Sequence, residues 1–324
     1  MRAGTADTEL IRAAVTLASR APSLHNTQPW LWVAHDDALH LHLDRSRIVR
    51  NTDTGGREAV IACGAMLDHL VTAMAVANWS AEVDRFPDPD DGAHLAAVAF
   101  TPTAEVTAAQ RRRADAILRR RTDRLPFLAP TDPRALETAL RAAIGPGPTV
   151  LDVLADELRT ELAETAALTE SAQRFNTGYQ AELDWWTAPF EYVEGIPRSS
   201  LTSAQETGRV TVNRNFPAEG NRRRRPHIGD DRAVVLVLST PEDTYRDALE
   251  CGEALSRVLL ECTAAGLATC PVTHITEIPS ARGVVAAMLP RPGVPQALIR
   301  VGRTPELEED PPMTPRRDIA EILR

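Results

Sequence analysis

The sequence predicts an α+β protein made of two related halves, and three observations support this prediction. A helical segment around Cys63-Gly64 resembles a helical segment around Cys251-Gly252, 188 residues further along the chain. A strand-like apolar segment precedes each of these helices, and another follows each one. The order strand, long helix, strand is therefore present twice, and such internal repetition is typical of a fused pair of homologous units.

The chain is expected to begin with a helix, a polar turn and a strand. Apolar residues at positions 10, 14, 17 and 18 have the spacing of one buried helical stripe, and Pro22 and Pro29 prevent the helix from continuing. Residues 30–33 then form a strand. The turn from Ala21 to Trp30 holds Ser, His, Asn and Gln, so it is either a plain connection or a binding loop.

The two repeated helices carry the same apolar stripe. With the shift of 188 residues, Leu67 aligns with Leu255, Val71 with Leu259 and Ala77 with Ala265. Each helix has a glycine where two backbones can approach closely. The flanking strands are expected at residues 39–43, 95–100, 233–238 and 296–301. The alternative is a coincidental likeness between two helices rich in alanine and leucine.

A basic segment between the two halves is a candidate anion site. A helix ends in Arg120-Arg121-Thr122-Asp123-Arg124, and guanidinium groups with a hydroxyl suit a phosphate. The alternative is a solvated basic patch, which is how we interpret residues 111–113. A second basic pair, Arg316-Arg317, follows Pro315 near the C-terminus.

Composition excludes several classes of protein. The net charge of −9 argues against a general affinity for nucleic acid, and all 36 basic residues are arginine, so no lysine is available for catalysis. No apolar run approaches the roughly 20 residues that span a bilayer, and the N-terminus lacks a signal-peptide core, so we expect a cytoplasmic protein without membrane contact. The four cysteines are expected to be buried thiols, and His40 and His42 share a strand face without an evident third metal ligand.

These motifs together resemble the FMN-dependent nitroreductase superfamily, and within it the fused, actinobacterial Acg-type branch. The stretch from Ala21 to Trp30 is similar to the family's motif of Ala-Pro-Ser, Asn and Gln-Pro-Trp. The basic run at residues 120–124 is similar to its phosphate signature, and residues 266–274 resemble its glycine-leucine loop under the flavin. The resemblance implies a nitroreductase-like fold with central sheets flanked by long helices, the two halves forming a pseudo-two-fold dimer.

The resemblance also implies which residues bind FMN. They are Pro22, Ser23, Asn26, Arg120, Arg121, Thr122, Arg124, Pro271, Val272, Thr273, His274, Arg316 and Arg317. Because the flavin performs the hydride chemistry, no protein side chain is assigned as catalytic and no metal is expected. His25 and His274 lie in the inferred flavin loops, where each either donates a proton to a substrate or simply forms structural hydrogen bonds.

The departures from the family pattern imply one flavin site. Residues 1–105, the degenerate first half, supply the Pro22-Ser23-Asn26 loop but have no phosphate signature before it. Residues 106–324, the second half, supply the signature and the flavin loop, but residues 143–149 stand where their own Pro-Ser loop should fall. We therefore expect one FMN per chain, at the interface of the halves, in a chain that is complete as a monomeric pseudo-dimer or forms a homodimer.

A polar insertion at about residues 185–227 interrupts the second half and resembles a lid. It contains Trp185, Trp186, Phe190, Tyr192 and the run Arg222 to Arg225, which either meets a nicotinamide phosphate or is solvated. Two functions remain open. In one, NAD(P)H reduces FMN and a small nitro compound or quinone is reduced in turn; in the other, the lid stays closed and the protein stores FMN without turnover.

Overall fold

The structure of the chain is a computed structural model that describes residues 6–35, 37–188, 194–217, 222–305 and 313–324. By the density of its contacts, the chain divides into two compact units. Unit 1 comprises residues 1–120, 244–264 and 315–324, and unit 2 comprises residues 121–243 and 265–314. Phe190 and Tyr192 of the predicted insertion lie outside the described residues.

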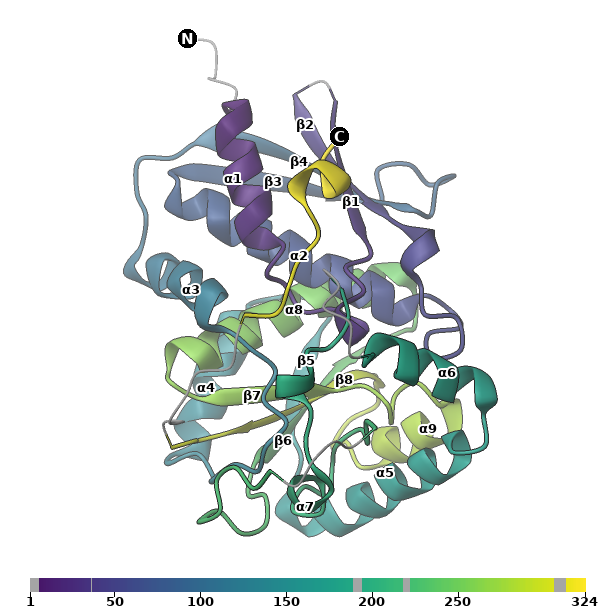
Figure 1. Cartoon of the computed structure of the whole chain (residues 1–324). Coiled ribbons are helices and arrows are strands. Elements are labelled where there is room, and N and C mark those ends of the chain that lie inside the picture. The colour runs from purple at the N-terminus through teal and green to yellow at the C-terminus, as the bar shows by residue number, and fades with distance from the viewer. Residues whose placement is uncertain (1–5, 36, 189–193, 218–221, 306–312) are drawn as a thin grey trace. The chain divides into compact units, whose positions relative to one another are not determined.

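Unit 1 is built around a four-stranded antiparallel sheet (Figure 1). Its strands are β1 (Trp30–His35), β2 (Ala38–Leu43), β3 (Trp79–Arg85) and β4 (His94–Pro102), and its helices are α1 (Thr8–Ala18), α2 (Arg57–Val76), α3 (Ala108–Arg119), α8 (Tyr245–Ala264) and α10 (Ile319–Ile322), with short 3-10 helices at Leu24–Asn26 and Arg45–Arg47. The C-terminus joins the sheet edge, because Arg324 donates to the Trp32 carbonyl and its own carbonyl accepts from Ala34. The last residues of the chain are thereby held beside β1.

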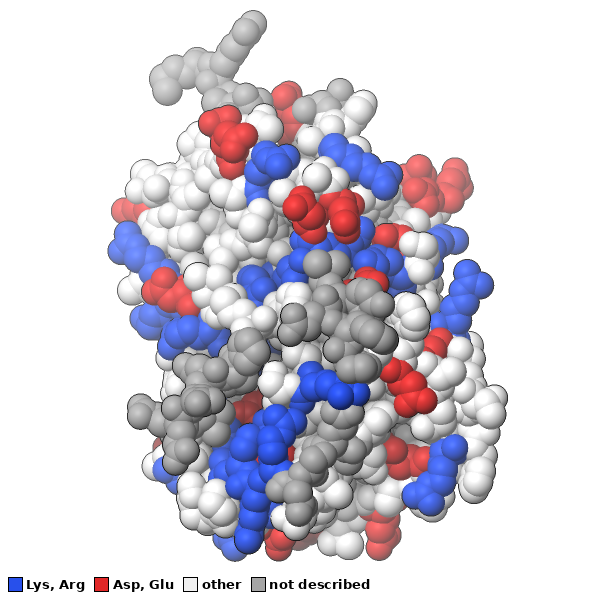
Figure 2. All heavy atoms as spheres, in the orientation of Figure 1, with Lys and Arg blue, Asp and Glu red and all other residues white. Residues whose placement is uncertain are grey.

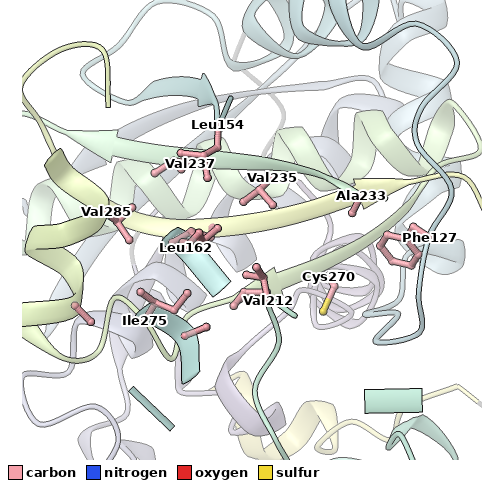
Figure 3. Close-up of a cluster of buried hydrophobic side chains, with 14 residues drawn as sticks. Phe127, Leu154, Leu162, Val212, Ala233, Val235, Val237, Cys270, Ile275 and Val285 are labelled. Atoms are coloured by element: carbon pink, nitrogen blue, oxygen red, sulfur yellow. The ribbon is translucent and has the colours of Figure 1, made fainter. Parts of the chain in front are cut away.

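Unit 2 contains a second four-stranded antiparallel sheet. Its strands are β5 (Val150–Val153), β6 (Val234–Thr240), β7 (Ala268–Val272) and β8 (Val294–Gly302), and its helices are α4 (Pro133–Ile144), α5 (Arg159–Gln173), α6 (Thr177–Trp186), α7 (Ala204–Thr207) and α9 (Pro279–Ala287), with short 3-10 helices at Asp156–Leu158 and Arg198–Ser200. Figure 3 shows the core of this unit, where buried side chains such as Val235, Leu162 and Phe127 pack together.

The two sheets have the same topology, which confirms the predicted repeat. Their strand orders are β1-β2-β4-β3 and β5-β6-β8-β7, and a 20-residue helix follows the second strand of each. The register also shifts at the same place, between Leu41 and His42 in β2 and between Leu238 and Ser239 in β6. The chain therefore consists of two homologous α+β halves fused in tandem.

The two repeated helices cross where each has its glycine. A Cβ atom added to Gly64 would lie 2.0 Å from the carbonyl oxygen of Leu249, and one added to Gly252 would lie 2.1 Å from that of Ile61. Each glycine thus meets the residue three positions before its counterpart, the reciprocal pattern of a two-fold interface. The close approach predicted for these glycines is confirmed, and it creates a local pseudo-two-fold axis inside unit 1.

The compact units differ from the predicted halves of residues 1–105 and 106–324. Helix α8 belongs to the second repeat by sequence but to unit 1 by packing, because it lies against α2, and α3 and the C-terminal segment also belong to unit 1. The departure from the repeat is longer than the predicted residues 185–227. The first two strands of unit 1 form a direct hairpin, whereas residues 154–233 separate β5 from β6. The extra helices α5 and α6 have ordinary helical patterns, which concealed the start of the insertion.

Helix α2 corrects one expectation drawn from hydropathy. It is long and apolar enough to cross a membrane by length and composition, although no apolar run was expected to approach that length. Most of it is buried inside unit 1, so its composition reflects packing on both sides. The four cysteines are free and buried, as predicted, and burial raises the pKa of Cys63, Cys262 and Cys270.

We predict that Gly64→Ala and Gly252→Ala each lower the free energy of unfolding by about 3 kcal/mol, because the new methyl group would overlap backbone atoms of the facing helix. Chemical denaturation measures this. Gly92→Ala is the matched control, since no atom lies within 4 Å of its added Cβ. Equal stability of all three variants would show that the helices do not cross at the glycines.

Candidate functional site

The polar loop after α1 has an unusual backbone. Its residues His25, Asn26 and Gln28 have φ angles of 49°, 63° and 53°, a region that residues other than glycine seldom occupy. All three are buried. Strain of this kind persists only where surrounding contacts impose it, and it is concentrated at binding and catalytic sites.

Contacts within the loop and contacts with the C-terminal segment hold this conformation. Gln28 donates its backbone N–H to Ser23 Oγ at 3.0 Å, and Asn26 Nδ2 donates to the carbonyl of Pro315 at 3.1 Å. The backbone N–H of Arg317 donates to Gln28 Oε1 at 2.9 Å, and its guanidinium donates to the Gln28 carbonyl. The predicted residues Ser23, Asn26 and Arg317 are therefore brought together, although Arg317 is already engaged by protein groups.

Two arginines predicted for one site meet at the end of α1, although they are far apart in the chain. Arg120 Nη2 and Arg316 Nη2 both donate to the carbonyl of Arg20, each at 3.2 Å. Arg316 also donates to the carbonyls of Ser19 and Ala21. These carbonyls belong to the three residues that follow the last turn of α1, and each is a hydrogen-bond acceptor for a guanidinium group. We call Arg20, Arg120 and Arg316 the arginine cluster.

The cluster has more donors than its surroundings use. Nε and Nη1 of Arg120 are buried and have no hydrogen-bond partner among the described residues. Burial, and then the charge of Arg20, lower the pKa of Arg120 to about 10. Burial and the neighbouring charges of Arg20 and Arg120 hold the pKa of Arg316 well below its usual value. A buried cation with free donors is costly, so the cluster has the charge and donors that an anion requires.

The other residues of the predicted phosphate run belong to unit 2. Arg121 is exposed, and Thr122 forms a parallel bridge with Thr269 next to β7. The guanidinium of Arg124 lies 4.9 Å from the ring centroid of Phe216 and donates to the Ser200 carbonyl. The run is thus divided at residue 120, and only Arg120 lies in the arginine cluster of unit 1.

The predicted flavin loop at residues 266–274 is largely a strand. Residues Ala268–Val272, including Pro271, form β7, which pairs with β8 on one side only. Proline lacks a backbone N–H, but an edge strand tolerates it. The prediction of a loop is wrong for Pro271 and Val272, while Thr273 and His274 follow the strand as expected.

A buried polar group of unusual composition follows β7. Both ring nitrogens of His274 are buried without a hydrogen-bond partner among the described residues, and burial with the charge of Arg214 lowers its pKa to about 3. Arg214 forms an ion pair with Glu277 and donates to Tyr179 Oη at 2.7 Å. Thr273 Oγ1 donates to Glu277 Oε1 at 2.8 Å. A neutral imidazole with two open positions can hydrogen-bond to a polar ligand edge.

The run Arg222 to Arg225 is a structural feature of the insertion. Arg224 pairs with Glu206, and the buried Arg225 pairs with Asp123 at 2.5 Å. Within this run, only Arg222 and Arg223 are exposed. Figure 2 shows basic side chains gathered near the position that α7 has in Figure 1. The interpretation of the whole run as solvated is therefore wrong, and its two last guanidinium groups are already paired.

The aromatic ring of Phe127 contacts both Arg225 of the insertion and Arg300 of strand β8. The guanidinium of Arg225 lies 5.9 Å from the ring centroid, and that of Arg300 lies 4.7 Å from it. Arg300 is fully buried and donates to both carboxylate oxygens of Asp231. Buried ion pairs therefore fasten the described residues of the insertion to the rest of unit 2.

Metal chemistry finds no support in the described part of the chain. No group of three or more His, Cys, Asp or Glu side chains there could hold a metal ion. His94 does join the predicted pair of histidines, since its Nε2 lies 3.0 Å from Nδ1 of His40 and its ring stacks on that of His42. Burial and the neighbouring histidines lower the pKa of His42 and of His94.

Sequence reasoning missed Arg20, Arg214 and Tyr179. No local motif marks them: Arg20 ends an ordinary helix, and Arg214 and Tyr179 lie in the insertion. Their partners are distant in the chain, so only the fold brings them together. His25 is buried in the loop, and its role and that of His274 stay predictions.

Comparison with known proteins shows close relatives over the whole chain. No family model matches. The chain is 53% identical over 316 residues to the Mycobacterium tuberculosis protein named "Putative NAD(P)H nitroreductase acg", covering 98% of this chain and 96% of that protein.

Two solved structures are more distant. A nitroreductase-type protein from Anabaena variabilis is 10% identical, with a TM-score of 0.48 over 93% of this chain and 90% of that one. The FMN-dependent nitroreductase NfnB of Mycobacterium smegmatis, in complex with NADPH, is 20% identical, with a TM-score of 0.39 over 66% of this chain and 97% of that one.

We predict that Asp123→Ala lowers the free energy of unfolding by about 4 kcal/mol, because it leaves the Arg225 guanidinium buried without its counter-charge. The matched control is Asp156→Ala, which removes an exposed ion pair with Arg159 and costs less than about 1 kcal/mol. Replacing both buried partners, in Asp123→Leu/Arg225→Met, recovers part of the loss. Similar denaturation midpoints for Asp123→Ala and Asp156→Ala would disprove the anchoring role.

Proposed function

This chain belongs to the Acg-type branch of the nitroreductase family, and we propose that it binds FMN. We further propose that it uses NAD(P)H to reduce a small electrophile such as a nitro compound or a quinone. A relative that is 53% identical over nearly all of both chains carries the name of an NAD(P)H nitroreductase.

The arginine cluster is the observation that carries this proposal. FMN ends in a phosphate dianion, and Arg120 has two buried donors without partners. Arg316 and Arg120 converge on one carbonyl, so their charges act at one place. We assign them as the main ligands of the flavin phosphate. Arg121, Thr122 and Arg124 stay further candidates by their resemblance to the family motif, and Arg317 is a residue that fixes the loop.

The strained loop is suited to the polar edge of the flavin. Ser23 Oγ accepts from Gln28, which leaves its own proton available to a ligand oxygen. Asn26 is held at Pro315, so its side-chain oxygen has a defined direction. Pro22 restricts the approach of the chain to this loop. These features support the assignment of Pro22, Ser23 and Asn26 as cofactor ligands.

The residues after β7 are proposed to bind the ring system. His274 has two unpartnered ring nitrogens, and the half-buried Pro271 and the buried Val272 precede it at the end of β7. Because the pKa of His274 is about 3, this side chain is neutral near pH 7 and cannot serve as an imidazolium acid there. We therefore propose that His274 forms a hydrogen bond with the flavin or substrate.

We propose that the chain binds one FMN. The second repeat has α4, residues 145–149 and β5 where the first has α1, the polar loop and β1, and residues 145–148 are exposed without a serine or asparagine. This asymmetry supports a single complete set of ligands. When bound, FMN supplies the hydride transfer, while the chain binds it, orients it and limits access to it.

Storage of FMN without turnover is the second candidate function. Buried ion pairs at Asp123 and Glu277 fasten the insertion to unit 2, and a fixed cover would keep nicotinamide from the ring. The same anchors are equally compatible with an enzyme whose fixed cover selects small substrates. The two functions differ in whether a reductant reaches the flavin.

We predict that Arg120→Met and Arg316→Met each weaken FMN binding about 10- to 100-fold, because each removes charge-assisted hydrogen bonds to the phosphate. Riboflavin, which lacks the phosphate, should bind all variants alike. The stability of flavin-free Arg120→Met should be equal to or above that of the parent chain, since a buried unpaired cation is removed.

The control for this experiment is Arg111→Met, an exposed position on the same helix α3. Fluorescence titration of the flavin-free proteins measures the affinities. Equal losses for FMN and riboflavin in Arg120→Met would contradict the assignment to the phosphate.

We predict that rapid anaerobic mixing of the holoprotein with NADPH or NADH bleaches its flavin absorbance. A nitroaromatic compound or a quinone, added afterwards, should restore that absorbance. Stopped-flow absorbance measures both steps. A flavin that stays oxidised with excess of either nicotinamide would rule out the enzyme and leave storage.

A further inference from the structure

A fully buried histidine of α2, a helix that packs against α1 and α3, has no role in the proposed function. His69 is 0% exposed, and its Nε2 has no hydrogen-bond partner among the described residues. The charges that act on it are those of Arg120 and Arg316. All of these residues belong to unit 1. The open nitrogen therefore lies within the electrostatic reach of the same two cations that are assigned to the phosphate.

The other ring nitrogen of His69 is fixed by a relay across the helix crossing. Nδ1 lies 2.8 Å from Ser256 Oγ, and Ser256 Oγ donates to Asp68 Oδ2 at 2.5 Å. Arg257 Nε donates to the other oxygen of Asp68, Oδ1, at 2.8 Å. Asp68 and Ser256 are equivalent positions of the repeat, so the local pseudo-two-fold axis brings this relay together.

The relay determines the protonation of His69. Ser256 has one proton and gives it to a carboxylate, which has none to return, so Nδ1 must be the donor toward Ser256. The carbonyl of Ala65 is a second acceptor for the ring. In the neutral ring, Nε2 is then a bare acceptor. Burial and the charge of Arg120, with a smaller contribution from Arg316, lower the pKa of His69 to about 3, so the ring is neutral without an anion.

A neutral acceptor cannot hydrogen-bond to a phosphate dianion unless a proton lies between them. We propose that His69 is a further ligand of the anion at the arginine cluster, and that binding of a phosphate monoester takes up one proton, shared between His69 Nε2 and a phosphate oxygen. The proton comes from the solvent, and no bond other than this hydrogen bond is formed. This inference rests on the proposed function, because it needs the flavin phosphate to bind at Arg120 and Arg316.

If His69 were not a ligand, binding of the phosphate would not be expected to take up a proton. Two arginines favour the dianion of the phosphate and lower its second pKa, which is about 6 in the free ester. Binding near pH 8 would then take up no proton. The groups that face His69 are Arg120 from the end of α3, Arg316 from the C-terminal segment, and Ser256 of α8 with Asp68 behind it. None of these others can accept a proton near pH 8 and also meet the phosphate.

Isothermal titration calorimetry of the flavin-free chain with FMN tests this inference. Titrations at about pH 8 in two buffers of different ionisation enthalpy give the number of protons bound, and we expect about one per FMN. The affinity should also fall about tenfold per pH unit above pH 8. Riboflavin should bind without proton uptake. FMN binding with no proton uptake would overturn the role of His69 and leave the proposed function intact.

Variants separate His69 from other histidines. His69→Asn should bind FMN without proton uptake and with a flat pH dependence, whereas His227→Asn, at an exposed position of unit 2, should behave as the parent chain. If His69→Asn does not fold, the number of protons that the parent chain takes up per FMN still tests the inference. An absence of FMN binding by the parent chain would overturn the phosphate site and this inference together.

Discussion

The crossing of α2 and α8 at Gly64 and Gly252 is the constraint on which the rest of the structure depends. Added Cβ atoms would meet carbonyl oxygens at about 2 Å, so only glycine allows this separation of the two backbones. Because the contacts are reciprocal, the crossing relates the two repeats by a local two-fold axis. It also brings Asp68 to Ser256 and thereby orients His69. A core contact between two repeats thus determines the direction of a side chain at the arginine cluster.

The arginine cluster is easier to understand as a binding site than as a stabilising feature. A guanidinium that caps a helix C-terminus contributes favourably, but a buried one with open donors does not. Arg120 has such donors, and the adjoining loop has three residues with positive φ. Features that reduce the stability of the free chain while suiting a ligand are expected where function is selected. The cost is local, and the C-terminal segment holds the strained loop in place.

Sequence patterns predicted the repeated parts of the fold best. The shift of 188 residues gave both long helices and their glycines, because close backbone approach leaves a glycine in each copy. Strand β3 was missed because its side chains alternate between half-buried and exposed, and β7 was taken for a loop because it contains Pro271. The helices α5 and α6 hid the true length of the insertion. Pattern reasoning was weakest where an element has no counterpart in the other repeat.

The candidate site could be predicted only in part for a physical reason. Arg120 and Arg316 lie in motifs that resemble those of a family, so both were predicted as ligands, and both donate to the Arg20 carbonyl in the structure. Arg214 and His69 could not be found, because a single polar residue in a helix or insertion carries no local signal. Only the tertiary structure shows that Arg214 forms a buried ion pair and that His69 has a ring nitrogen without a partner among the described residues. The same holds for Arg225, whose basic run looked like a solvated patch until Asp123 was placed beside it.

The central claim is that two homologous halves, each incomplete, supply one set of flavin ligands. The first half has the polar loop, and the second has exposed residues at the equivalent position, so the pseudo-symmetry of the core does not extend to the ligands. The ratio of flavin to chain tests this most directly. Holoprotein saturated with FMN and freed of excess is denatured, and the released flavin is measured against total protein. The account predicts one FMN per chain; two per chain, or none, would contradict it.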